Sequence, residues 1–263
     1  MKRTGAVVLG VLLSSCTWGQ IRLTKLVLEP KQVYELKGSD ILVVDTLIMK
    51  DSATIILNKL KPDNFIHAKA AIFYRGSMID GKGVYGIKGR TGRTGLSPLS
   101  PCTDGGPGSA GGGGSDGGKG TNLSIYLLDI TLKGTLTIDV SGGDAGDGGK
   151  GGAGGGGGPG TRPCAGGKGG DGAAGAKGGD GGQAGVIAFN SPRIPELRLM
   201  LGGPIIIRNY GGNHGLGGEG GAAGYSGLSP VGNNKMDGKP GRKGAKAKDG
   251  VAGKSGAINF TDK

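Results

Sequence analysis

The chain has 263 residues, enough for one large domain or two small ones; 64 are glycine and 12 proline, whereas aromatic residues make up only 4%. Glycine and proline at this level without periodicity are typical of disordered sequence, so the spacing of the glycines is decisive. The formal net charge of +12 serves solubility and favours anionic partners, but nucleic acid is disfavoured because no aromatic residues are interleaved with the cations to stack on bases.

The first 20 residues are predicted to be an export signal. Lys2 and Arg3 precede an apolar stretch, residues 6–13, that is too short to cross a bilayer as a helix. Residues 13–16, Leu-Ser-Ser-Cys, resemble a bacterial lipobox, in which residues 1–15 are removed and Cys16 is lipidated. The alternative is a signal peptide of residues 1–19, similar to those of secreted proteins from Bacteroidetes-like bacteria. Either reading implies export to the periplasm or cell surface of a Gram-negative bacterium, with membrane contact only through a lipid on Cys16.

Residues 20–82 lack periodic glycine and contain short apolar runs at 41–44, 46–49 and 54–57, separated by polar turns. Strands of four or five residues at this spacing are typical of successive faces of a β-helix. The sequence therefore predicts N-terminal β-solenoid coils over residues 20–82.

Glycine then recurs at every third position in six segments, with Ala247 in the one missing slot. The segments begin at Gly83, Gly105, Gly143, Gly166, Gly212 and Gly238. A period of three matches the polyproline II helix, which has no internal hydrogen bonds, so its backbone needs partners on neighbouring segments or in water. A collagen trimer needs proline and a single glycine face, whereas the third and fourth segments carry glycine on two faces. The pattern favours an intramolecular polyglycine II bundle.

The six segments pair into three hairpins, residues 83–120, 143–185 and 211–256, joined by short turns that contain proline. Cys102 and Cys164 lie in the first two turns. They can form a disulfide if these hairpins point the same way; two free thiols are the alternative, less common outside the cytosol. The first and last segments carry many cations and should lie outside, with the third and fourth more central.

Short β-type stretches flank the hairpins. Residues 128–143 align with 197–212 without a gap, and strands follow the hairpins at 123–126, 187–190 and 258–261. The predicted fold is all-β: a β-solenoid (β-helix) scaffold with three inserted glycine-rich hairpins that form a six-segment polyglycine II bundle, the hairpins and strands occupying residues 83–263.

This arrangement resembles exported glycine-rich bacterial proteins that are often labelled collagen-like, over most of the mature chain. Residues 83–256 also resemble the polyglycine II receptor-binding domains of some tailed-phage adhesins. In those domains the loops at the bundle tip determine what is bound. The resemblance therefore points to the tip loops as binding candidates, and the exposed residues there are Arg162, Asn233, Asn234 and Lys235.

No residue set identifies a reaction. His67 and His214 have no metal-ligand spacing, and residues 142–147 resemble a calcium-binding repeat only loosely, so no metal or cofactor is expected. Five aspartates are candidate carboxylates for polysaccharide chemistry, but nothing pairs them at catalytic separation, which favours turn and solubility roles. They are Asp45, Asp51, Asp80, Asp129 and Asp139.

The sequence thus predicts a non-catalytic exported protein, an adhesin or an envelope spacer, whose partners are anionic envelope glycans or another envelope protein. A β-helix carbohydrate-active enzyme and a collagen-like trimerising stalk remain as alternatives. Ice binding is disfavoured by the many charges of the outer segments. The oligomeric state is open.

Overall fold

The structure, a computed structural model, describes residues 20–230 and 236–261. Within them the chain is nearly all β and forms two parallel sheets, consistent with a β-helix-like fold. The six-stranded sheet contains β1 (Ile21–Leu28), β3 (Ile41–Met49), β5 (Asp63–Phe73), β7 (Asn122–Leu132), β9 (Ile187–Asn190) and β11 (Ile258–Thr261), in that order. The five-stranded sheet contains β2 (Val33–Glu35), β4 (Thr54–Ile56), β6 (Ser77–Asp80), β8 (Leu136–Asp139) and β10 (Ile205–Arg208). The prediction of an all-β fold is confirmed.

The chain alternates between the two sheets, so each odd-numbered strand and the even-numbered strand after it make one coil. Successive coils stack through parallel pairing, as in β3 with β5 and β4 with β6. Apolar side chains at alternate strand positions fill the space between the sheets, where Phe73 and Phe189 are the largest fully buried residues. Residues 41–44 and 46–49, expected as two strands, are one continuous strand, β3.

A second expectation is wrong: the sequence alignment predicts β-type structure from residue 197, but α1 (Ile194–Met200) is a short helix. Pro195 lies in its first turn, where a missing N–H costs no intrahelical hydrogen bond. Ile194 and Leu197 are buried at the i, i+3 spacing of one helix face. This spacing also fits a strand poorly, because residues three apart on a strand lie on opposite faces.

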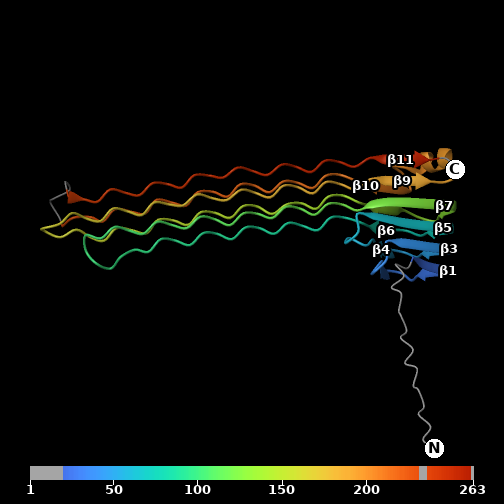
Figure 1. The fold of residues 1–263 in the computed structure, drawn as a ribbon, viewed down its shortest axis with the longest axis horizontal. Coiled ribbons are helices and arrows are strands. Elements are labelled where there is room, and N and C mark those ends of the chain that lie inside the picture. The colour runs from blue at the N-terminus through green and yellow to red at the C-terminus, as the bar shows by residue number, and fades with distance from the viewer. Residues whose placement is uncertain (1–19, 231–235, 262–263) are drawn as a thin grey trace, which may run out of the picture.

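Six extended glycine-rich segments leave the sheets and run side by side as a long rod (Figure 1). We call them the glycine bundle and number the segments in chain order, with the bounds 83–95, 105–120, 142–160, 166–185, 211–227 and 238–256. They are held together by sets of backbone hydrogen bonds, each of which recurs at three-residue intervals, with lengths of 2.7–3.2 Å.

Two kinds of hydrogen bond build the glycine bundle. One joins a segment to its antiparallel predecessor, as when the N–H of Gly149 donates to the carbonyl of Gly112. The other joins a segment to the parallel one two further along, as when the N–H of Gly89 donates to the carbonyl of Asp147. The third and fourth segments therefore bond to four neighbours each, whereas the first and sixth bond to two.

Glycine is required where the backbones of neighbouring segments lie against a segment on two sides. A Cβ atom at Gly149 would overlap the backbone carbonyl of Arg90, and one at Gly148 would overlap that of Ala176. At Gly113, whose position faces outward, the nearest atom to an added Cβ is the carbonyl oxygen of Lys177 at 4.0 Å. Close packing, rather than a left-handed backbone, explains the glycines, because no positive φ occurs in the described segments.

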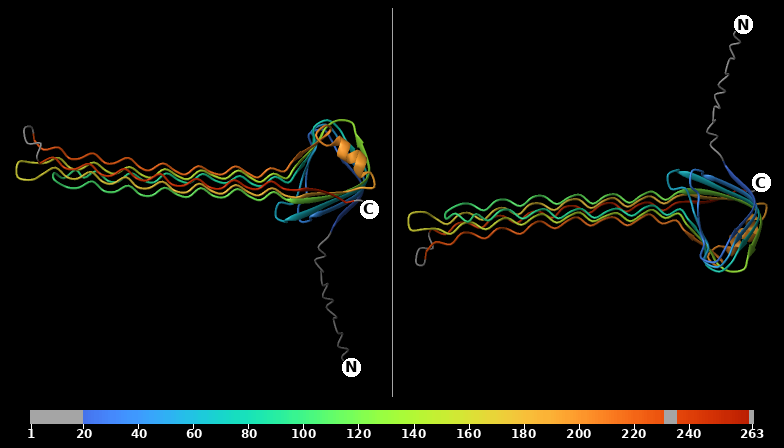
Figure 2. Two further views of the ribbon diagram at one scale, coloured as in Figure 1. Left: turned by 90° about the horizontal axis from the view of Figure 1, so that it is seen from above. Right: turned by 90° about the horizontal axis from the view of Figure 1, so that it is seen from below.

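The glycine bundle continues the hydrogen-bond pattern of the sheets. β6 pairs with β8, and the same pairing runs on as the N–H groups of Gly81 and Gly83 donate to the carbonyls of Asp139 and Ser141. The sheets and the rod meet without a break in both views of Figure 2. The stack of coils thus sets the order and spacing of the segments that emerge from it.

Aspartate side chains on the surface of the glycine bundle accept hydrogen bonds from backbone N–H groups that have no backbone carbonyl as partner. Each accepts a hydrogen bond of 2.7–3.0 Å from an N–H of a neighbouring segment. The pairs are Asp144 with Asn213, Asp147 with Leu216, Asp171 with Arg242, and Asp180 with Val251. The bond from Arg242 lowers the pKa of Asp171, and for Asp180 the pKa is lowered first by Lys177 and then by the N–H of Val251.

A disulfide joins Cys102 to Cys164, with 6.1 Å between their Cα atoms. It ties together the first two turns at the far end of the glycine bundle, 62 residues apart in sequence. A link of this span removes much conformational freedom from the unfolded chain.

We expect Gly149→Ala to destabilise the protein by about 1–3 kcal/mol or more, because a methyl group overlaps the carbonyl of Arg90. The matched control is Gly113→Ala, which has room and should leave the free energy of unfolding unchanged or raise it by about 0.5 kcal/mol. Urea unfolding followed by circular dichroism measures both; equal losses in the two variants would contradict the packing.

Asp171→Asn should lower the melting temperature near neutral pH, since the amide keeps the acceptor oxygen but loses the charge. The pKa of Asp171 lies below its ordinary 3.8, so its carboxylate stabilises the fold fully above 3.8 and loses this effect as pH falls through the folded value. The gap between the wild-type and variant melting curves should therefore close in acid. A gap that persists once Asp171 is protonated in both the folded and the unfolded chain would show that the charge is not the cause.

Reduction of the disulfide, or Cys102→Ser with Cys164→Ser, should destabilise the protein by about 4 kcal/mol, as the chain-entropy estimate gives for a loop of this size. Melting with and without reductant measures the effect. The double serine variant serves as control, because reductant should not change its melting temperature.

Candidate functional site

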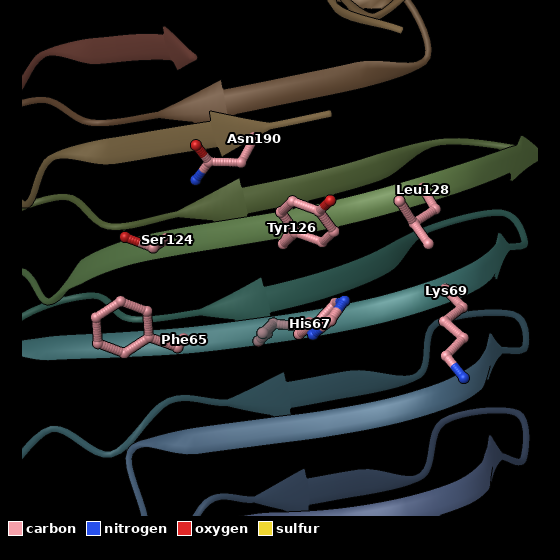
Figure 3. A pocket seen from close by; sticks show the side chains of 8 residues that line it. Phe65, His67, Lys69, Ser124, Tyr126, Leu128 and Asn190 are labelled. Atoms are coloured by element: carbon pink, nitrogen blue, oxygen red, sulfur yellow. The ribbon is translucent and has the colours of Figure 1, made fainter. Parts of the chain in front are cut away.

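Side chains from three strands line a shallow hollow of about 510 Å³ on the outer face of the six-stranded sheet. Figure 3 shows Phe65, His67 and Lys69 on β5, and the neighbouring side chains on β7 and β9. These latter are Ser124, Tyr126, Leu128 and Asn190. The parallel register places His67 opposite Tyr126 and Tyr126 opposite Asn190, so the three residues form one row across the strands.

The hollow combines aromatic and polar groups. The rings of His67 and Tyr126 meet edge to face, with centroids 4.6 Å apart and an interplanar angle of 87°. Phe65 is 43% exposed and adds a second aromatic surface. Such a surface can pack against a flat, partly apolar ligand such as a sugar ring, with Asn190 and Ser124 as hydrogen-bonding groups.

Lys69 closes one end of the hollow and forms an ion pair of 2.8 Å with Asp45 on β3. The hydrogen bond from Lys69 lowers the pKa of Asp45, so this carboxylate stays ionised near neutral pH. A general acid needs the opposite shift.

The other four candidate aspartates also have structural partners. Asp51 and Asp129 lie 3.9 and 3.2 Å from Arg75 and Arg193, and Asp80 lies 3.2 Å from Lys59. Asp139 is 5% exposed and accepts the N–H of Ser141 at 3.0 Å. The contacts of Asp51, Asp80 and Asp129 fit the turn and solubility roles that the sequence favours, but a solubility role is wrong for Asp139, which is buried.

The tip-loop candidates are only partly placed. Arg162 is exposed in the turn that also holds Cys164, at the end of the glycine bundle far from the sheets. Asn233, Asn234 and Lys235 lie outside the described residues, as does the lipidation candidate Cys16.

The histidines and the calcium-like motif do not come together. His214 is exposed in the fifth segment, and His67 lies on the sheet. Asp144 and Asp147 of the motif bind backbone N–H groups of the fifth segment. Within residues 20–230 and 236–261, no three His, Cys, Asp or Glu side chains gather in a way that could hold a metal ion.

Sequence reasoning missed the hollow. Its residues come from strands separated by about 60 residues, with a glycine hairpin inserted between them. The available signal was the repeat register: aligning the strands at 65–67, 124–126 and 188–190 puts His67, Tyr126 and Asn190 in one row.

No protein-family model matches the chain, and neither a curated protein nor a solved structure is detectably similar to it. In the described part of the chain, the one helix is too short to cross a bilayer. The Cys102–Cys164 disulfide is compatible with an exported protein.

Proposed function

We propose that this chain is an exported, non-catalytic protein of the bacterial cell envelope or surface, which projects its tip loops on a rigid rod. Its base is a β-solenoid, and its glycine bundle is a six-segment polyglycine II rod. Residues 1–19, or 1–15 with a lipid on Cys16, direct it to the periplasm or the cell surface. Its partners are anionic envelope glycans or another envelope protein.

One observation carries the proposal: the hydrogen bonds that pair the strands continue into the glycine bundle and repeat along it every third residue. A structure tied to its neighbours at this interval bends little, because bending would break bonds in several segments at once. A segment of 20 residues, such as 166–185, spans about 60 Å at about 3.1 Å per residue. Such a length suits an envelope spacer or the stalk of an adhesin.

Intramolecular pairing also favours a single-chain rod over a collagen-like trimer. The two central segments have both glycine faces covered by segments of the same chain. In a collagen-like trimer only one glycine face packs at the axis, so the second glycine face would have no packing partner.

The purified exported protein should sediment as one chain and give, in small-angle X-ray scattering, a rod profile whose bundle part measures about 60 Å. A threefold mass would support the trimerising stalk. A profile of a flexible coil, or a compact globule, would contradict the spacer.

A further inference from the structure

The sixth segment, residues 238–256, forms one edge of the glycine bundle. It bonds only to the fourth and fifth segments, and its glycines face inward toward them. The other two positions of its triplets are exposed, from Lys239 to Ser255. This edge therefore presents two adjacent rows of side chains along much of the rod.

Cations fill most positions of one row and fewer positions of the other. Lys239, Arg242, Lys248 and Lys254 are separated by multiples of three and lie in one row, while Lys243 and Lys246 lie in the other. In a polyproline II geometry, positions three apart recur about every 9 Å. The charges thus stand at fixed intervals on a backbone that is already ordered.

Few of these cations form ion pairs, although Asp171 and Asp180 of the fourth segment lie against this edge and accept the N–H groups of Arg242 and Val251. Among the residues that the structure describes, Lys246 is the only one of the six cations within ion-pair distance of a carboxylate, 3.0 Å from Glu219. Asp249, the one acid on the segment, accepts the N–H of Gly217 at 2.6 Å. At physiological salt the Debye length is about 8 Å, so attraction of an anionic ligand to this edge should weaken as salt is added.

A further glycine segment or a second copy does not suit this edge. At the positions where the fourth segment has glycines such as Gly169 and Gly172, the sixth has Pro240 and Lys243. Pro240 lacks the N–H that would donate to an added neighbouring segment, and the side chain of Lys243 occupies the space that such a segment would fill. Such residues protect open edges from further pairing.

Nucleic acid also fits poorly. Single-stranded nucleic acid binds through bases stacked on aromatic side chains, and residues 236–257 contain none. A linear polymer of acidic sugars needs no stacking platform and carries its charges on an extended chain.

We propose that the edge formed by Lys239, Arg242, Lys243, Lys246, Lys248 and Lys254 binds a linear acidic polysaccharide laid along the rod. This inference rests on the proposed envelope function and moves the binding surface from the tip loops to the side of the glycine bundle. Because the row is ordered before binding, little freedom is lost on the protein side apart from the side chains themselves.

The test uses the full chain and immobilised polygalacturonate, with neutral dextran as a blank and an oligothymidylate as competitor. One variant carries Lys239→Gln, Arg242→Gln and Lys248→Gln. The matched control carries Arg90→Gln and Arg93→Gln on the first segment and Lys119→Gln on the second, so both variants lose three exposed cations; Lys88 is kept, because it lines the same hollow of the glycine bundle as Lys246.

We expect salt-sensitive binding of the wild type, about tenfold weaker binding of the sixth-segment variant, and a change within about twofold in the control. No binding by the wild type, or equal losses in both variants, would overturn the assignment to this edge. Stronger binding of the oligothymidylate would overturn the glycan as partner. Scattering profiles of the variants separate this inference from the spacer function, which stands if the rod dimensions are unchanged.

Discussion

The structure depends on backbone hydrogen bonds between segments, because a single extended segment forms no hydrogen bonds within itself. A polyproline II segment can satisfy its N–H and C=O groups only through a neighbour or water. Neighbours reach each other only where side chains are missing, so the need for pairing becomes a need for glycine at every third position, and at two positions of three in the centre. The disulfide between Cys102 and Cys164 fixes the end of an assembly that is already ordered along its length.

The same constraint distributes the charged residues. Inward positions of the central segments hold glycine or, as at Ala145 and Ala173, a single methyl group, so acids and cations collect on the two outer faces and the two edges of the glycine bundle. On the outer faces, aspartates such as Asp144 and Asp171 accept amides of the next segment. Beyond the sixth segment there is no further segment whose N–H groups need an aspartate acceptor, and cations take many of the exposed positions. The charge pattern thus follows from the number of neighbours that each segment has.

Much of the β framework could be predicted from the sequence, because strand alternation and the alignment of 128–143 with 197–212 report local pairing. That alignment gives the observed partnership of Leu136 with Ile205 in β8 and β10. It fails at α1, where Pro195 and the spacing of Ile194 and Leu197 favour a helical turn over a strand. The hollow is harder to predict: the strands expected at 123–126 and 187–190 align Tyr126 with Asn190, but His67 joins them only once the length of the preceding coil is known.

Because the rod emerges from the stacked coils, the width of the rod and its length can change independently. Adding one coil with its hairpin would widen the rod by one outgoing and one returning segment without lengthening it. Adding one glycine triplet to every segment would extend the reach by about 9 Å and leave the sheets untouched. Duplication of a coil and slippage within a glycine tract are different genetic events, so selection can tune breadth and reach separately.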